Sequence, residues 1–296
     1  MNKKTLLITG TSGFIGFHFL EHALSKNYYV IDILKKKKKN ITKIKKLKKK
    51  YSNRYKTIFF SDYKQLEKKL KKIKIDCFIH FATLYKSHHN HKDIFELIDS
   101  NVLFPTLIYD LILQKTKKFI NFGTMMQHTD GKTFKPNNLY AATKNAFEMI
   151  TSFYSTKKDG GNFYNIKLYE SFGELDKRKK LIPTIIRNYK KKTTTKIYSK
   201  NLELNIIHID DIIKAIEILL KKNIKPGSYC LKQKKNIKVI KLIEYLNENL
   251  KNKIKVKYDN KSVTKINKSK IKILPGWKPE IPIIEKIKEN FDNETN

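Results

Sequence analysis

A tyrosine and a lysine four residues apart form a pair able to move a proton. Tyr140 and Lys144 enclose the run Tyr-Ala-Ala-Thr-Lys, and a four-residue step places both side chains on one face of a helix. Because a neighbouring ammonium lowers the pKa of a phenol, we expect Tyr140 to exchange a proton with a carbonyl or alcohol oxygen. Thr124 ends an expected strand and can donate a hydrogen bond to the same oxygen.

A glycine-rich loop supplies the second signal. Gly10, Gly13 and Gly16 follow an expected strand, open a helix and account for three of the ten glycines in the chain. In this GxxGxxG spacing the glycines permit a tight turn, a close approach to a pyrophosphate and tight helix–strand packing. The motif predicts a dinucleotide held by Gly10, Ser12, Gly13, Phe14, Ile15 and Gly16. Lys144 would then also hold the nicotinamide ribose.

The end of the next strand bears on which dinucleotide is bound. An acid there would hold the ribose hydroxyls of NAD, but the residue is Leu34, followed by Lys35 and Lys36. The sequence therefore favours NADPH, whose 2′-phosphate the lysines would attract. Asp32 lies two positions earlier, and a small change of register would make it the ribose ligand and favour NAD. Asp62, after the third strand, is either an acceptor for the adenine amino group or a solvated loop acid.

Buried strand-like runs alternate with helical patterns through the first two thirds of the chain. The expected strands are 5–8, 28–34, 58–60, 77–80, 119–122, 165–168 and 206–209, and the clearest helices are 14–25, 137–154 and 212–220. The lysine-dense run 35–50 is expected to hold a loop and a charged helix. Such alternation predicts an α/β fold with a Rossmann-like, doubly wound parallel sheet.

The apolar segments become shorter and more separated beyond about Pro183. We therefore expect a dinucleotide-binding domain over residues 1–182 and a smaller substrate-binding lobe over residues 183–296. The strand and helix near 204–220 are expected to return to the main domain.

The composition excludes several function classes. The 64 Lys and Arg against 27 Asp and Glu give a net charge of +37, but 40% hydrophobic residues argue against disorder. Lysine is spread over nearly every segment without a nucleic-acid-binding motif, so we interpret it as solvated surface that attracts phosphorylated ligands, not as a specific nucleic-acid site. No apolar run approaches a membrane span or a signal peptide, and we expect a cytoplasmic protein with no membrane partner.

The cysteines and the histidine-rich run do not have the spacing that a disulfide framework or a metal site requires. Cys77 and Cys230 lie in apolar runs, without the spacing of a disulfide framework or a zinc site. The histidines of the run 88–91 have no partner carboxylate at a helical spacing. We therefore expect no metal.

Four further motifs give the chain a family resemblance over almost its whole length. They are His80-Phe81-Ala82-Thr83, Asn101-Val102, the segment 204–211 (Leu-Asn-Ile-Ile-His-Ile-Asp-Asp) and the segment 274–279 (Leu-Pro-Gly-Trp-Lys-Pro). With the glycine loop and the Tyr140–Lys144 pair, they resemble the extended short-chain dehydrogenase/reductases of the NAD-dependent epimerase/dehydratase branch, which act on nucleotide sugars. The resemblance implies cofactor contacts from Phe81, Ala82 and Asn101, a substrate contact from Thr83, and a homodimer.

Departures from the family pattern reduce the number of reactions that the site could catalyse. Met125 and Met126 follow Thr124 where the 4,6-dehydratases of this branch carry an Asp and a Glu that move the protons of elimination. The runs 119–121 and 167–173 are most similar to the CDP-dideoxyhexose 4-ketoreductases, the abequose and paratose synthases. In the second run Glu170 replaces the Asn of the family motif. Met125 and Glu170 are candidate substrate contacts, and Lys177 and Arg178 would face the diphosphate of a nucleotide sugar.

Three hypotheses follow. The first is a reductase in which a nicotinamide hydride reaches C4 of a keto-sugar nucleotide of the kind used in cell-surface polysaccharide synthesis, while Tyr140 protonates the oxygen. The second is a 4-epimerase that uses the same residues and retains NAD. The third is a non-catalytic Rossmann protein that senses a cofactor or binds nucleic acid.

Overall fold

A seven-stranded parallel sheet is the centre of the molecule. The computed structural model describes residues 4–35, 42–60, 62–157, 160–259 and 270–293. The strand order is β11-β6-β5-β4-β1-β2-β3, and every neighbouring pair is parallel. The strands are β1 (Thr5–Thr9), β2 (Tyr29–Lys35), β3 (Tyr55–Phe60), β4 (Cys77–His80), β5 (Lys118–Thr124), β6 (Asn162–Leu168) and β11 (Gly227–Leu231). The predicted Rossmann-like sheet is confirmed.

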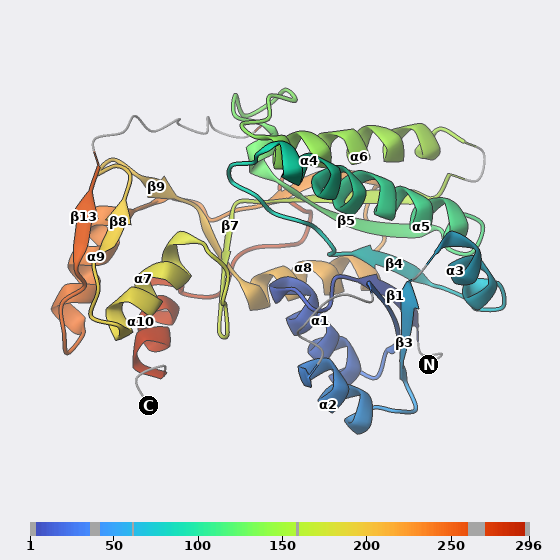
Figure 1. The fold of residues 1–296 in the computed structure, drawn as a ribbon, viewed down its shortest axis with the longest axis horizontal. Coiled ribbons are helices and arrows are strands. Elements are labelled where there is room, and N and C mark those ends of the chain that lie inside the picture. Colours follow the sequence, from blue (N-terminus) through green and yellow to red (C-terminus); the bar gives the residue numbers. More distant parts are fainter. Residues whose placement is uncertain (1–3, 36–41, 61, 158–159, 260–269, 294–296) are drawn as a thin grey trace.

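Helices cover both faces of this sheet (Figure 1). One face carries α1 (Phe14–Ser25), α2 (Thr42–Lys50) and α8 (Ile209–Lys221), and the other carries α3 (Tyr63–Leu70), α4 (His91–Ile98), α5 (Phe104–Ile112) and α6 (Leu139–Ser155). Successive side chains of β1 point to opposite faces of the sheet, so the core is divided between the two helical layers. Leu6 and Ile8 pack on the side of α1 and α8, and Leu7 packs on the side of α5 and α6. The charged helix expected within residues 35–50 is α2.

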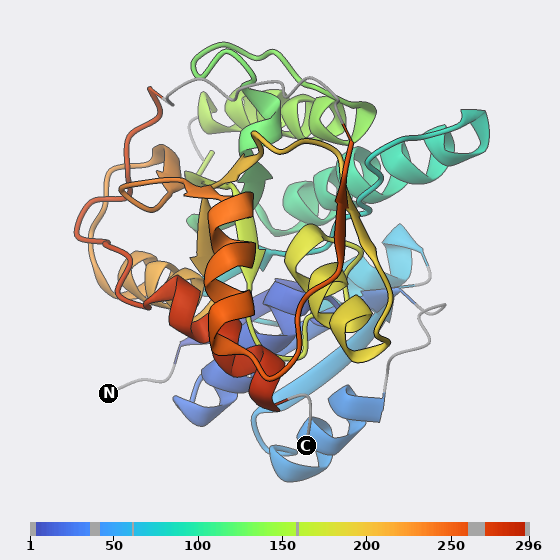
Figure 2. The same ribbon diagram turned by 90° about the vertical axis from the view of Figure 1, so that its left-hand side faces the viewer.

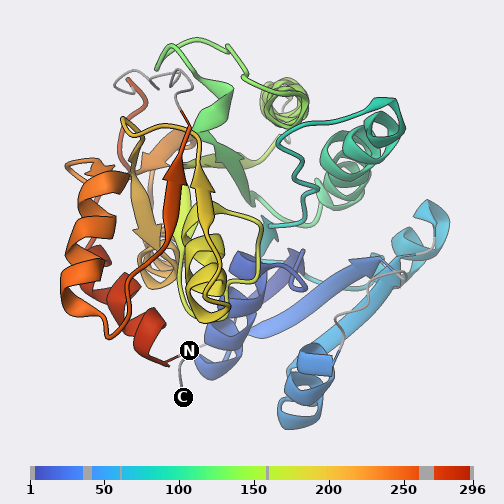
Figure 3. The ribbon, with the colours of Figure 1, turned by 60° about the vertical axis from the view of Figure 1, so that its left-hand side comes forward.

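Three small two-stranded sheets and three helices form a second lobe with its own core (Figures 2 and 3). The pairs are β7 (Glu170–Phe172) with β10 (Ile206–His208), β8 (Thr195–Ile197) with β13 (Val256–Tyr258), and β9 (Glu203–Leu204) with β12 (Ile237–Lys238). The helices are α7 (Leu181–Lys190), α9 (Val239–Asn249) and α10 (Ile283–Asn293). Two later segments lie with the main sheet, since α8 packs against α1 and β11 pairs with β6. The division at residues 182 and 183 stays a prediction.

Two motifs distant in sequence meet at the start of α8. The indole nitrogen of Trp277 donates to the Asp211 carbonyl (2.8 Å), and the Asp211 carboxylate accepts from the backbone of Glu280 and Ile281. These bonds tie the chain after residue 274 to the main sheet.

The histidine-rich run opens a helix. Asn90 caps α4 and forms a capping box with Asp93. No helix among the described residues is long and apolar enough to cross a membrane, and the cytoplasmic location stays a prediction.

Candidate active site

The strand order reverses between β1 and β4, and parallel α/β sheets bind ligands at such a point. The glycine loop leaves β1 and the 80–83 turn leaves β4, so the two turns are neighbours at the carboxyl edge. The Thr9 hydroxyl and His80 Nδ1 are 2.7 Å apart, and the Phe81 N–H donates to the Thr9 carbonyl (3.1 Å).

The three loop glycines meet different surroundings. Gly10 has a φ of +80°, and a Cβ there would collide with the backbone of Ala82. A Cβ on Gly16 would collide with the Gly10 carbonyl, whereas one on Gly13 would meet only that oxygen, at 3.2 Å. Gly13 is also exposed. Gly10 and Gly16 are therefore required by packing, and Gly13 keeps the backbone above the loop open.

A cavity of about 330 Å³ lies over the glycine loop. Its walls come from the loop, α1, the start of α2 and the segment after β7: Ser12, Gly13, Phe14, Phe17, His18, Thr42, Lys43, Leu175, Lys177 and Arg178. The wall holds Lys43, Lys177 and Arg178 and no acidic residue, a composition suited to phosphate groups, although Arg178 is paired with Asp176 outside the wall.

Lys177 and Arg178 thus lie above the glycine loop. The Arg178 guanidinium lies 4.2 Å from the centre of the Phe14 ring and pairs with Asp176. Lys43 was not expected from the sequence. The available indication was its neighbour Ile44, an apolar residue in a lysine-rich segment and the one that α2 buries. Ile15 is absent from the cavity wall.

Asp32 does not occupy the strand end. It is fully buried and accepts hydrogen bonds from the Thr11 hydroxyl (2.5 Å) and the Tyr55 hydroxyl (2.8 Å). Burial raises the pKa of Asp32 to about 7. The alternative reading of Asp32 as the ribose ligand is wrong for this structure, because its carboxyl group is directed at Thr11 and Tyr55 inside the fold.

Other residues expected to bind the cofactor lie at the end of β2 and after β3. Leu34 occupies the expected position and is 6% exposed. β2 ends at Lys35, whose side chain, like the whole of Lys36, lies outside the described residues. The Asp62 carboxylate caps α3 by accepting from the Gln65 N–H (2.9 Å), so Asp62 has at least this structural role.

Helix α6 carries the expected proton donor. Asn138 caps it, and Tyr140 and Lys144 are 8% and 2% exposed. Burial raises the pKa of Tyr140; Tyr85 and Glu170 raise it further, while Thr83 and Arg178 act in the opposite direction. Burial and, to a lesser extent, the charge of Lys167 lower the pKa of Lys144 to about 7, while Glu148 acts in the opposite direction.

The expected effect of Lys144 on the phenol is therefore not what this structure has. Burial of the Tyr140 phenol outweighs the groups that lower its pKa, and burial and Lys167 disfavour the ammonium form of Lys144 itself. The pKa of Tyr140 in this structure lies above its ordinary value.

Thr124 ends β5 at the carboxyl edge and is 9% exposed. Its hydroxyl accepts from the Met126 N–H (3.2 Å), which leaves the hydroxyl proton available, and its own N–H donates to Gln127 Oε1 (2.8 Å). Met125 is only 1% exposed, so it presents almost no surface to a ligand.

Asn101 supports the site from behind. It is fully buried within a π-helical turn, η1 (Asp99–Leu103). Its side-chain oxygen accepts from the Thr83 hydroxyl (2.9 Å) and the Leu84 N–H (2.8 Å), and its nitrogen donates to the Leu84 carbonyl and the Thr143 hydroxyl. In this arrangement Asn101 fixes the 83–84 loop against α6 and has no free group for a direct cofactor contact.

Glu170 and Lys180 form an ion pair at the mouth of the site (2.8 Å). Lys180 also lies 5.7 Å from the centre of the Tyr85 ring, which packs edge-on against Tyr140 at 5.0 Å. Glu170 was expected from the sequence as a substrate contact and that role stays a prediction, whereas Lys180 and Tyr85 were not expected, because their proximity to Tyr140 depends on three separate segments of the chain.

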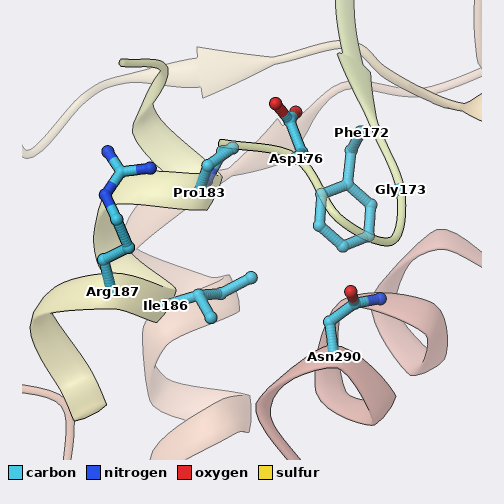
Figure 4. Close-up of a pocket in the computed structure, with 7 residues that line it drawn as sticks. All are labelled: Phe172, Gly173, Asp176, Pro183, Ile186, Arg187 and Asn290. Atoms are coloured by element: carbon cyan, nitrogen blue, oxygen red, sulfur yellow. The ribbon is translucent and has the colours of Figure 1, made fainter. Parts of the chain in front are cut away.

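A smaller pocket lies beside the chain segment that follows β7 (Figure 4). It lies between β7, α7 and α10, and Arg187 in its wall donates to the Arg178 carbonyl (3.0 Å). Its volume of about 10 Å³ is close to the minimum for one water molecule. We therefore place no ligand there.

The residues present fit a nicotinamide dinucleotide. The glycine loop is open at Gly13 beneath a basic cavity. Lys144 is buried, and across the described ranges it forms no hydrogen bond or ion pair. A buried lysine without a partner is costly, which is consistent with an ammonium reserved for a ligand.

Comparisons with known proteins relate the chain to a family and to solved folds. The family model described as "NAD dependent epimerase/dehydratase family" matches residues 6–231. The CDP-abequose synthase of Salmonella muenchen is 29% identical over 266 residues, covering 87% of this chain and 84% of that protein. The dTDP-D-glucose 4,6-dehydratase of Dictyostelium discoideum is 27% identical over 252 residues, covering 74% of this chain and 56% of that protein.

Among solved structures, the UDP-glucuronic acid 4-epimerase of Bacillus cereus, in complex with UDP-glucuronic acid and NAD, superposes with a TM-score of 0.83 at 19% identity, covering 99% of this chain and 100% of that one. At this identity the likeness concerns the fold. The family match spans the glycine loop, Thr124, Tyr140 and Lys144. The chain is therefore an enzyme of the NAD-dependent epimerase/dehydratase family, within the extended short-chain dehydrogenase/reductases.

Proposed function

We propose that this enzyme reduces the 4-keto group of a nucleotide-activated deoxysugar with NADPH. The observation that carries the proposal is the turn after Thr124, where Met125 and Met126 stand in place of an acid pair and leave Tyr140 as the proton donor of the site. Such a site suits a carbonyl reduction, which needs one proton, and not an elimination. The similarity to a CDP-abequose synthase over 87% of the chain supports the same class of substrate.

The residues have separate tasks in this reaction. When bound, the nicotinamide cofactor would supply a hydride for the carbonyl carbon, and Tyr140 would give its proton to the oxygen as the C–O double bond becomes a single bond. Thr124 donates a hydrogen bond to that oxygen and stabilises its developing charge. Lys144 orients the nicotinamide ribose. The raised pKa of Tyr140 keeps the phenol protonated before the transfer.

The preference for NADPH rests on charge. Leu34 stands where an acid would bind the ribose of NAD, and Lys43 lies in the wall of the cavity over the glycine loop. Dissociation constants for NADPH and NADH, measured with the native protein and Lys43→Glu, test this. Lys43→Glu should weaken NADPH more than NADH, and tighter NADH binding by the native protein would contradict the proposal.

The reaction itself is tested by a substrate panel. The purified protein is mixed with nucleotide 4-keto-sugars and NADPH, the loss of NADPH absorbance is followed, and NMR identifies the stereochemistry of the product. We expect stoichiometric conversion of a 4-keto group to an alcohol for at least one deoxysugar. If NADPH is not oxidised in the presence of any of the 4-keto-sugars, the proposed reductase activity is contradicted.

A 4-epimerase is the second candidate, favoured by the likeness in fold to a solved 4-epimerase. Thr124, Tyr140 and Lys144 would then serve proton transfer in both directions. Copurification with tightly held NAD, and interconversion of 4-epimers without added reductant, would transfer the assignment to this candidate. The non-catalytic alternative is set aside by membership of an enzyme family.

We also propose that the enzyme is a homodimer joined through α4 and α6. The two helices pack together and expose apolar side chains: Phe95 (78% exposed), Met149 (58%), Phe153 (56%), and Ile94 and Ile98 (43% each). An apolar patch of this kind on paired helices suits a self-complementary contact. Sedimentation should show a dimer that Phe95→Asp with Phe153→Asp dissociates, whereas Tyr29→Asp, at an exposed aromatic elsewhere, leaves it intact. A monomeric native protein would contradict the proposal.

A further inference from the structure

Lys167 is a buried charge that the proposed reaction does not use. It lies on β6 with no exposed surface, and its ammonium pairs with the Glu148 carboxylate on α6. The same carboxylate accepts hydrogen bonds from Gln127 Nε2 (3.0 Å) and the Ser228 hydroxyl (2.8 Å). Because a buried carboxylate needs partners to offset its desolvation, this convergence holds Glu148 in one place.

Lys144 presents the opposite case. It is also buried, at 2% exposure, yet in the part of the chain that the structure describes its ammonium forms no hydrogen bond or ion pair. Glu148 follows it by four residues, a spacing at which lysine and glutamate pair on a helix. With Glu148 already held by Lys167, Gln127 and Ser228, Lys144 is left for a ligand.

The same network reaches Thr124. Gln127 donates to Glu148, and its side-chain oxygen accepts from the Thr124 N–H (2.8 Å). The Lys167 side chain also passes beside Gly123, where an added Cβ would lie 2.9 Å from its Cδ. One ion pair is therefore connected both to the neighbour of Lys144 and to the turn that carries Thr124.

We propose that Lys167 is a positioning residue of the active site: by binding Glu148 it keeps Lys144 unpaired for the cofactor and, through Gln127, fixes the turn that carries Thr124. The proposal rests on the nicotinamide site at Lys144, but not on the identity of the sugar. Lys167 acts through these neighbours and not on the reacting atoms.

The charges around Lys144 determine how its pKa should change when Lys167 or Glu148 is substituted. Glu148 and Tyr140 lie on its own helix, Lys167 faces it from β6, and His80 from β4 is deeply buried with a pKa well below its ordinary value. Removing Lys167 removes a like charge and releases Glu148, so the pKa of Lys144 rises. Removing the charge of Glu148 lowers it. The two substitutions therefore shift the titration of Lys144 in opposite directions.

Cofactor titrations test this without any sugar substrate. NADPH dissociation constants are measured from about pH 6 to pH 9, a range that spans the pKa of Lys144, for the native protein, Lys167→Met and Glu148→Gln. Lys167→Met should weaken NADPH binding about tenfold, because the Lys144 ammonium would first have to leave the released Glu148 carboxylate. Its loss of affinity with rising pH should move to higher pH, and that of Glu148→Gln to lower pH.

Three further variants separate positioning from packing. Lys167→Arg retains the charge and should bind NADPH nearly as the native protein does. Lys167→Met combined with Glu148→Gln removes the released carboxylate and should recover most of the lost affinity. Lys118→Met removes a half-buried lysine from the far end of the neighbouring strand β5 and should change neither affinity nor pH profile.

Two results would overturn the proposal: native affinity and pH profile in Lys167→Met, or a double variant as defective as Lys167→Met. Should Lys167→Met fail to fold, the expected shift of Glu148→Gln to lower pH is measured against Lys167→Arg, which should keep the native profile, and coincident profiles for these two would contradict the proposal. If the native protein binds NADPH but reduces no keto-sugar, the proposed reaction fails while these titrations still decide the role of Lys167.

Discussion

The glycine loop and helix α6, which carries Tyr140 and Lys144, border the same edge of the sheet but are built differently. In the loop, backbone geometry dominates: Gly10 and Gly16 are fixed by steric contact, and the charges above them stand in an open cavity. In α6, the important groups are buried side chains whose charges depend on one another, as with Lys144 and Lys167. In the function we propose, phosphate binding would thus rely on shape and accessible charge, whereas proton transfer would rely on burial.

The largest expected effect tests the catalytic side. Tyr140→Phe should lower turnover by at least ~10²-fold with little change in cofactor affinity, because a general acid contributes about 10² to 10⁴. Steady-state kinetics and NADPH titration check both parts. Tyr85→Phe is the matched control, since it keeps the packed ring and should retain most activity. Near-native turnover by Tyr140→Phe would remove this residue from the mechanism.

A pair of alanines tests the glycine loop. Gly10→Ala should destabilise the fold by about 2 kcal/mol or more, because its positive φ and the Ala82 backbone both oppose a side chain. Gly13→Ala should remain nearly as stable but bind NADPH more weakly, since its Cβ would enter the open space over the loop. Urea unfolding and cofactor titration distinguish the two. Equal stability of both variants would contradict the packing role of Gly10.

Opposite pH slopes should distinguish the two regions. The pKa of Asp32, beneath the loop, is raised to about 7, so the folded state holds its proton where the unfolded state has lost it. Its contribution to stability is therefore present at low pH and is lost as pH rises from about 4 to about 7, by up to about 1.4 kcal/mol per pH unit. Asp32→Asn should flatten the dependence of unfolding free energy on pH in that window.

Lys144 should give the reverse slope. Its folded pKa of about 7 lies below its ordinary value, so the unfolded state binds more protons between about pH 7 and pH 10. Stability should rise with pH across this window, and Lys144→Met should remove the rise. Urea unfolding of the native protein and Lys144→Met at several pH values measures it. Parallel pH curves for these two proteins would show that burial of Lys144 costs nothing.

The smallest expected effect concerns the diffuse charge of +37. Nucleic acid should bind at low ionic strength, without sequence preference, and dissociate steeply near physiological salt, because the affinity comes from counterion release. Binding to unrelated RNAs and DNAs across a salt series, with and without NADPH, checks this. A salt-resistant, sequence-selective complex would show a built nucleic-acid site.

The sequence by itself determined the parts of this protein that depend on local geometry. The loop glycines and the Tyr140–Lys144 spacing each lie within seven residues, where turn sterics and helix periodicity dictate placement. The alternation of strands and helices, down to the helix 14–25 and the strand 77–80, follows from hydrophobic periodicity. These features predict the Rossmann-like sheet and the helix that carries Tyr140 and Lys144 correctly.

Only the tertiary structure decided the electrostatics and the walls of the site. The burial of Asp32 against Thr11 and Tyr55, and the placement of Arg178 on Phe14, join residues from distant segments. The pKa of Lys144 depends likewise on Lys167, which is 23 residues away in sequence. The physical reason is that desolvation and Coulomb interactions depend on distances in the folded chain, which no local spacing specifies.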